Sequence, residues 1–427
     1  MLKPINSEKD LGRLNAILKR SQFEEADINE TVANVLKRVR DEGDSALYDF
    51  TARFDGVALQ SLKVDPKTVK DAYDRLSEEL LTALKNARTN IERFHRAQKD
   101  ESYTLKNEGA SVGQRVTPLS TVGIYIPGGT AAYPSTVLMN AIPASIAGVG
   151  KIVMVTPPGK DGRVKPAILV AADLAGVDEI YTIGGAQAVA ALTYGTKSVP
   201  KVDKITGPGN MYVAVAKRMV SGYVGIDMVA GPSEITIIAD ETSDPAQVAA
   251  DMFSQAEHDV YASSVALIND EATAEKVSLE IARQLENAPR KDTIEASLRD
   301  YGAIITTPSV EHSIELANAI APEHLEILTK DPETVSEKIL NAGAIFIGPY
   351  SPEPIGDYYA GPNHTLPTSG TARFMSALST RDFQKQTSVI HYSKEAFMNA
   401  ADDVIRLAEE EGLYAHAEAI RLRKEGS

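Results

Sequence analysis

The sequence predicts an α/β protein in which parallel sheets are flanked by helices. Three observations predict this fold class: short apolar runs alternate with helical stretches in the middle of the chain, glycine-rich turns follow some of these runs, and the charged ends have a helical pattern. Strand–helix alternation implies parallel strands joined by right-handed crossovers. We expect two such α/β units, one inside residues 120–235 and one across 236–380.

The first unit contains two apolar runs that predict buried strands. Lys151–Thr156 ends in Pro-Pro-Gly, and Glu179–Ile183 is followed by Gly184-Gly185. Ala167–Leu174 lies between the runs and Ala186–Leu192 comes after them, and both have the composition of helices. The order strand, helix, strand, helix predicts a parallel sheet here.

The second unit continues the alternation with further apolar runs and amphipathic stretches. The predicted strands are Ile235–Ala239, Ser263–Ile268, Ala303–Thr307 and Ala344–Ile347, and the predicted helices are Pro245–Glu257 and Ala272–Glu286.

The two ends of the chain are predicted to be helical. Residues 1–110 are charged, and apolar positions recur at helical spacing in Ala26–Glu42 and Leu76–Phe94. Asp382–Ser427 reads as a helical tail. No low-complexity tract or long linker separates these regions.

The composition excludes several classes of protein. A chain of 427 residues with a formal charge of −15 lacks the basic surface that nucleic-acid binding needs. The absence of cysteine excludes disulfides, thiolate zinc sites and a cysteine nucleophile. The polar start MLKPINSEKD is no signal peptide, so we expect a cytoplasmic protein. Residues 121–150 carry no charge, but their prolines and glycines argue against a membrane span.

A dinucleotide site is only weakly indicated by the residues themselves. Two α/β units suggest one, but the G-x-G-x-x-G pattern is absent. The nearest candidates are Gly184-Gly185-Ala186-Gln187 and Gly207-Pro208-Gly209-Asn210. A glycine turn before a helix exposes N–H groups that suit a phosphate. Taken alone, each motif is more typical of a tight turn than of a phosphate site.

Two of the clusters around the seven histidines combine residue types suited to metal binding and proton transfer. Gln255 and His258 are three residues apart at a predicted helix end, where an amide oxygen and an imidazole can reach one zinc ion. The alternative is a solvated pair. Pro322-Glu323-His324 places a carboxylate beside an imidazole at a predicted helix mouth, a plausible acid–base pair. The alternative is an ordinary helix start.

The remaining histidines give weaker indications. Asp357 and His364 lie in a glycine- and proline-rich loop, which is typical of functional loops and of plain turns alike. His416 follows Glu411 by five residues in the helical tail, where it fits an exposed helix face. Nothing in their neighbourhoods gives a role to His95, His312 or His391.

Taken together, these segments resemble the histidinol dehydrogenase family, and the resemblance covers nearly the whole chain. The segments that carry it are Gly123–Gly129, Ile183–Ala188, Thr206–Asn210, Ala230–Glu234, Gln255–His258, Ala321–Leu325 and Gly361–Thr368.

The resemblance implies a reaction and a set of roles. The reaction converts L-histidinol, two NAD+ and water into L-histidine and two NADH through a bound aldehyde, with one zinc ion per subunit. Glu323 matches the residue that activates water, and His324 matches the acid–base residue that takes the alcohol proton. Gln255, His258, Asp357 and His416 match the zinc ligands, and these four residues and His324 also match substrate contacts. Further substrate contacts match Ser233, His364 and Glu411. The NAD contacts match Tyr125, Gln187 and Asn210.

The resemblance also implies an architecture. It predicts two incomplete Rossmann-like units with small helical N- and C-terminal segments, in a homodimer whose active sites are shared because Glu411 and His416 reach the other subunit. The predicted division has four parts. They are an N-terminal helical arm (1–25), a first α/β domain with the metal and catalytic loops (26–120 and 236–380), a second α/β domain on the NAD side (121–235) and a C-terminal helical tail (381–427).

Two other functions compete with this one. A paralogue with the same zinc and NAD apparatus would act on another small alcohol, but Ser233, His364 and Glu411 are all present, which favours histidinol. A non-catalytic metal-binding or scaffold protein would give Glu323 and His324 no reason to accompany a full ligand set.

Overall fold

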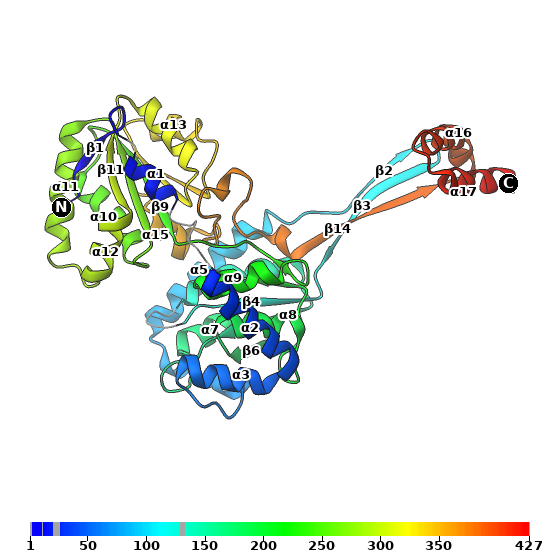
Figure 1. Cartoon of the computed structure of the whole chain (residues 1–427), viewed down its shortest axis with the longest axis horizontal. Helices are drawn as coiled ribbons and strands as arrows, with labels where there is room; N and C mark the ends of the chain where they lie inside the picture. The colour runs from blue at the N-terminus through cyan, green and yellow to red at the C-terminus, as the bar shows by residue number, and fades with distance from the viewer. Residues whose placement is uncertain (1, 11, 20–25, 129–132, 427) are drawn as a thin grey trace. The chain divides into compact units, whose positions relative to one another are not determined.

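The computed structural model describes residues 2–10, 12–19, 26–128 and 133–426. The chain divides into two compact units (Figure 1). The larger unit contains Met1–Gln98 and Leu119–Phe383, and the smaller contains Lys99–Pro118 and Gln384–Ser427. Among the described helices, none has the length and hydropathy needed to cross a membrane.

The larger unit contains a six-stranded parallel sheet, and a hydrophobic core packs against each of its two faces. Every strand except the edge strands β1 and β13 is fully buried, which explains why the sequence shows continuous apolar runs instead of alternation. The strands, in spatial order, are β1 (Pro4–Asn6), β11 (Gly302–Thr306), β10 (Ser263–Ile268), β9 (Glu234–Ala239), β12 (His324–Leu328) and β13 (Ala344–Ile347). One face packs on α10 (Pro245–Ala256), α11 (Glu271–Leu285) and α12 (Lys291–Tyr301), and the other on α1 (Gly12–Leu18), α13 (Val310–Ile320) and α14 (Pro332–Ser336).

A five-stranded parallel sheet forms the other core of this unit. Its order is β6 (Glu179–Thr182), β5 (Lys151–Thr156), β4 (Thr121–Tyr125), β7 (Lys204–Thr206) and β8 (Gly225–Ile226). On one face lie α2 (Ala26–Glu42), α3 (Asp44–Phe50), α8 (Gly185–Tyr194) and α9 (Met211–Val220). On the other lie α4 (Pro66–Ala72), α5 (Glu78–Arg96), α6 (Pro134–Ala147) and α7 (Pro166–Leu174).

Short elements connect these layers. They are η1 (Thr51–Asp55) and η2 (Tyr73–Arg75) among the first helices, and α15 (Glu353–Ile355), η3 (Gly356–Ala360), η4 (Thr371–Arg373) and η5 (Thr380–Phe383) after β13.

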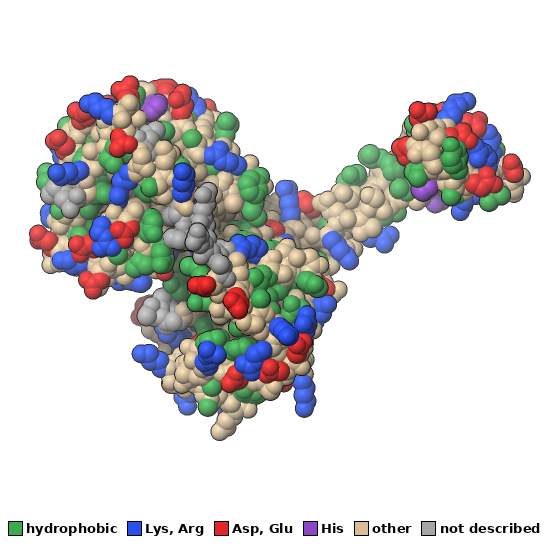
Figure 2. All heavy atoms as spheres, in the orientation of Figure 1, with side chains coloured by type: hydrophobic (Ala, Val, Ile, Leu, Met, Phe, Trp, Pro, Cys, Tyr) green, Lys and Arg blue, Asp and Glu red, His purple; other side chains and the backbone are tan. Residues whose placement is uncertain are grey.

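The smaller unit is an antiparallel ribbon with two helices. The strand order is β14 (Gln384–Tyr392), β3 (Ala110–Pro118) and β2 (Tyr103–Asn107), and α16 (Lys394–Glu410) packs against α17 (Tyr414–Glu425). The buried apolar residues among its described positions are all alanines: Ala396, Ala401, Ala408 and Ala417. Large apolar side chains instead lie at the surface, as Figure 2 shows; they include Leu105, Ile390, Leu407, Tyr414 and Leu422.

The two predicted α/β units and their flanking helices are confirmed, and the structure differs from the prediction at the ends. The tail from 382 begins with the nine-residue strand β14, because Thr387, Val389 and Ile390 pair with β3. The described part of 1–25 contributes a strand, β1, as well as a helix. Helices α2 to α5 pack on the five-stranded sheet, whereas the predicted division grouped 26–120 with 236–380.

Candidate active site

Potential metal ligands converge near the amino-terminal ends of the strands of the six-stranded sheet. His258, Glu353 and Asp357 each offer a ligand atom, and these atoms lie within 4.8 Å of one another. His258 lies two residues after the end of α10, and its N–H donates to the carbonyl oxygen of Gln255. Glu353 begins α15, and Asp357 lies in η3 four residues later. Two of the predicted ligands, His258 and Asp357, are thus brought together.

The buried side chain of Gln255 is a second, independent indication of a metal site. Its side chain is fully buried in the last turn of α10, and neither amide atom has a hydrogen-bond partner among the described residues. A buried amide without a partner is costly, and coordination of a cation by Oε1 removes part of that cost. Nitrogen and oxygen donors of this kind suit zinc, so the residues present fit a divalent ion.

The Glu323–His324 pair lies at the start of β12. The prediction of a helix mouth is wrong here, because His324 pairs with Ile235 of β9 as the first strand residue. Both side chains are buried. Glu323 Oε2 accepts the N–H of Glu234 at 2.9 Å, and His324 Nδ1 donates to the carbonyl oxygen of Glu234 at 3.1 Å. This arrangement leaves His324 Nε2 facing Asp357 Oδ1, at 3.6 Å.

Burial and neighbouring charges shift the protonation equilibria of this pair. Burial raises the pKa of Glu323 to about 8. Burial alone would lower the pKa of His324, but the carboxylates of Glu323 and Asp357 outweigh it and raise this pKa. A cation bound to Asp357 would cancel part of that carboxylate's effect on His324.

The ligand group itself has the protonation states that metal binding needs. Burial alone would raise the pKa of Asp357, but its interaction with His324 outweighs burial and lowers this pKa to about 2, which favours the ionised carboxylate. Desolvation lowers the pKa of His258 and therefore favours its neutral, ligating form.

Two loops hold the predicted substrate residues next to this centre. His364 Nδ1 donates to the carbonyl oxygen of Asp357 at 2.9 Å. The segment after His364 returns to the loop of Ser233, since Thr368 Oγ1 accepts the N–H of Gly231 at 2.6 Å. Ser233 and His364 are therefore held on neighbouring segments.

Two residues that sequence reasoning missed support this geometry. Glu353 is buried, its pKa is raised to about 7 mainly by burial, and its Oε2 accepts from Ser254 Oγ at 3.0 Å. Its only sequence signal was its place four residues before Asp357, one helical turn away. His95, which was given no role, is fully buried in α5, and its Nε2 lies 3.3 Å from the Nδ2 of Asn363, beside His364.

The five-stranded sheet brings the predicted dinucleotide residues to one edge. The strand order reverses at β4, because β5 and β6 lie on one side of it and β7 on the other. Ligands of open α/β sheets bind outside the carboxyl ends of the strands at such a reversal. Tyr125 is the last residue of β4, and its hydroxyl accepts the N–H of Gly185 at 3.0 Å.

Gln187 and Asn210 lie at the starts of the helices that follow β6 and β7. Gln187 is buried in the first turn of α8, next to Gly185. Asn210 is the N-cap of α9, and its Oδ1 accepts the N–H groups of Tyr212 and Val213. These two bonds use Oδ1 and leave the side-chain NH2 of Asn210 outside the cap.

Two predicted residues lie in the smaller unit. Glu411 follows α16, and His416 is in the first turn of α17; both are exposed. Within one chain they are not part of the ligand group described above.

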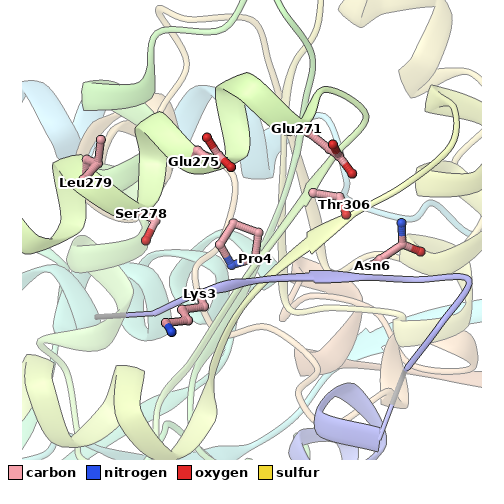
Figure 3. A pocket seen from close by; sticks show the side chains of 8 residues that line it. All are labelled: Lys3, Pro4, Asn6, Glu271, Glu275, Ser278, Leu279 and Thr306. Atoms are coloured by element: carbon pink, nitrogen blue, oxygen red, sulfur yellow. The ribbon is translucent and has the colours of Figure 1, made fainter.

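A surface hollow elsewhere contains none of the predicted residues. It lies between β1 and α11, as Figure 3 shows, and its lining is Lys3, Pro4, Asn6, Glu271, Glu275, Ser278, Leu279 and Thr306.

The fold and these two groups of residues define an α/β oxidoreductase, and comparison with known proteins gives its family. A family model described as histidinol dehydrogenase matches residues 18–424. The chain is 53% identical over 409 residues to the histidinol dehydrogenase of Clostridium acetobutylicum, covering 96% of this chain and 95% of that protein. It is 54% identical over 418 residues to that of Caldanaerobacter subterraneus, covering 97% of each.

A solved structure agrees with these sequence relatives. The crystal structure of histidinol dehydrogenase from Elizabethkingia anophelis superposes with a TM-score of 0.94 at 38% identity, covering 100% of this chain and 98% of that one. The chain belongs to the histidinol dehydrogenase family.

Proposed function

We propose that the chain oxidises L-histidinol through a bound aldehyde to L-histidine, with two NAD+ and one zinc ion per subunit. Family membership supports the reaction. The observation that carries the site is the buried side-chain amide of Gln255, which has no hydrogen-bond partner among the described residues. Gln255 comes three residues before His258, and His258 is grouped with Asp357, which faces His324 of the Glu323–His324 pair.

The residues proposed to hold zinc are Gln255, His258 and Asp357, with the partner subunit's His416 completing the set. A zinc ion in such a site supplies positive charge that orients the amino alcohol and polarises its oxygen. Glu353 lies close enough to His258 and Asp357 to restrict the position of a bound ion. These side chains, together with Ser233, His364 and Glu411, are proposed to border the substrate.

His324 is proposed to take the proton of the substrate hydroxyl at Nε2. Because Nδ1 donates to the carbonyl oxygen of Glu234, the ring is fixed with Nε2 facing Asp357. Nε2 would carry the lone pair in the neutral ring, a form that a cation bound to Asp357 would favour by cancelling part of the charge of that carboxylate. Glu323 is proposed to activate water for the second oxidation. Its raised pKa makes the ionised carboxylate a stronger base than an exposed glutamate. Tyr125, Gln187 and Asn210 are proposed to contact NAD at the edge of the other sheet.

The test is the stoichiometry of NADH formation by purified, zinc-loaded enzyme. We expect two NADH per L-histidinol and no comparable turnover of other small amino alcohols. His324→Asn should retain zinc and lower turnover by at least about 100-fold, since general acid–base catalysis contributes that much or more. Glu323→Gln should release one NADH rapidly and slow the second oxidation. Absence of NADH from L-histidinol would reject the proposal.

We further propose a homodimer with shared active sites. In the described part of the smaller unit, only alanines are buried, and the side chains of Leu407, Tyr414 and Leu422 are 61% exposed or more. Apolar surface of this kind is typical of a protein interface, so we expect a second subunit to cover it. Residues Glu411 and His416 lie on this unit.

Mixing two inactive variants tests this sharing. His324→Asn and His416→Asn should each be nearly inactive, because each loses one part of every site. After subunit exchange, a mixed dimer regains one intact site, and about a quarter of wild-type activity should return in an equimolar mixture. Recovery of no activity, with exchange verified by tagged subunits, would contradict shared sites.

A further inference from the structure

The turn at Gly207, directly after β7, is held unusually tightly. Gly207 has a φ of 109°, and a Cβ there would lie 2.1 Å from the carbonyl oxygen of Tyr125. Only glycine permits both the backbone conformation and the close approach. The backbone of the turn therefore lies directly against the end of β4.

A buried ion pair holds Gly207 from both sides. Its N–H donates to Asp227 Oδ2 at 2.8 Å, and its carbonyl oxygen accepts from Lys217 Nζ at 2.9 Å. Lys217 and Asp227 form an ion pair with each other, and their side chains are only 2% and 1% exposed. Lys217 comes from α9, and Asp227 directly follows β8.

Stability alone is a weak reason for such a pair. Desolvation of two charges offsets much of their attraction, and apolar residues of similar volume are often as stabilising. What apolar residues do not reproduce is the pair of hydrogen bonds to the N–H and carbonyl oxygen of Gly207. The geometry therefore points to a role in fixing this turn.

The turn carries a residue of the proposed cofactor site. Asn210 follows Gly207 by three residues, and Pro208 restricts the intervening backbone. Asn210 is also fixed as the N-cap of α9, the helix that carries Lys217. Movement of the Gly207 peptide would therefore shift Asn210 relative to Tyr125.

We propose that Lys217 and Asp227 are positioning residues of the dinucleotide site: they hold the Gly207 turn so that Asn210 and Tyr125 face the same NAD molecule. Neither residue touches the cofactor. The proposal rests on the proposed function, in which Asn210 and Tyr125 contact NAD.

The experiment measures NADH binding by fluorescence in zinc-loaded, full-length variants. Lys217→Met should weaken NADH binding and raise the KM for NAD+ by at least about tenfold, with zinc content and the KM for L-histidinol unchanged. The double variant Lys217→Met/Asp227→Met removes both charges, so it should unfold near the wild-type temperature and still bind NADH weakly. Lys204→Met is the matched control, because it breaks the Lys204–Asp382 ion pair at β7 without touching Gly207.

The outcomes separate this proposal from the one on which it rests. Wild-type NADH affinity in the folded double variant would overturn the positioning role, as would failure of both Lys217 variants to fold. A wild-type enzyme that binds no NADH would overturn the proposed function itself. Equal weakening in the Lys204→Met control would show a general effect of lost ion pairs and would also overturn the positioning role.

Discussion

At the scale of single residues, the buried amide of Gln255 links metal binding to stability. An unpartnered buried amide destabilises the metal-free protein, and a bound ion relieves that cost. Zinc should therefore stabilise the wild-type chain by an amount that increases with the logarithm of its affinity.

Gln255→Met separates these two effects. The metal-free variant should be as stable as the wild type or more stable, by roughly 1 kcal/mol, because methionine fills the same volume without polar atoms. Zinc content should fall, and the increase in unfolding temperature on adding zinc should largely disappear. Thermal unfolding with and without zinc, together with metal analysis, checks this. A variant that keeps one zinc per chain would remove Gln255 from the ligand set.

Asn363 shows how a structural residue can affect a neighbouring substrate residue. Its Nδ2 donates to the carbonyl oxygen of Met139 at 2.5 Å and lies 3.3 Å from His95 Nε2, while its Oδ1 accepts the N–H of Thr365 at 2.9 Å. The peptide of His364 lies between these contacts. Loss of this anchor should therefore release His364 from its position near Asp357.

Asn363→Ala should lower the free energy of unfolding by roughly 1–3 kcal/mol and raise the KM for L-histidinol, with NADH affinity unchanged. The control is Asn318→Ala, which removes a comparable set of side-chain hydrogen bonds to the backbone of residues 338, 340 and 341. That variant should lose stability without a change in KM. An equal rise in KM in both variants would show that general destabilisation, and not the position of His364, is responsible.

At the scale of elements, Glu179 joins separate segments around β6. It accepts from Lys63 Nζ at 2.6 Å and lies 3.0 Å from Nζ of Lys151 in β5. Partial burial would raise the pKa of Glu179, but these lysines lower it to about 2. Because the folded pKa is below the unfolded value, the stabilisation is complete above about pH 5 and is lost as the pH falls towards 2.

Glu179→Gln should therefore reduce the free energy of unfolding by roughly 1–2 kcal/mol at pH 7 and by clearly less at pH 3. Urea unfolding of both proteins at the two pH values measures the difference. In the Glu179→Gln background, Lys63→Met should have little additional effect. A difference between wild type and variant that is the same at pH 7 and pH 3 would contradict the assigned ion pairs.

The elements that the sequence predicted well are those whose pattern is local. Lys151–Thr156 and Ser263–Ile268 are strands with the predicted bounds, because fully buried strands are continuous apolar runs. β14 and β12 were not predicted, since β14 is mostly exposed and depends on pairing with β3, and Glu323-His324 resembles a helix start. Glu353 was missed because only the fold brings it to His258.

At the scale of the whole molecule, the predicted site draws on segments far apart in the sequence. Gln255 comes from a helix end, Glu323 directly precedes the strand β12, and Asp357 lies in the short helix η3. The family resemblance named these positions, whereas local patterns gave only alternatives. The involvement of the partner's His416 and the cytoplasmic location remain predictions.

Strand β1 also determines when the larger sheet can be completed. Pro4 pairs with Ile304, so 300 residues (304 minus 4) separate the two partners. During synthesis this first strand leaves the ribosome long before β11 exists, and closing so long a loop is slow. The edge of β11 therefore stays open until late, and β1, although it is translated well before its partner, is among the last segments to find its place.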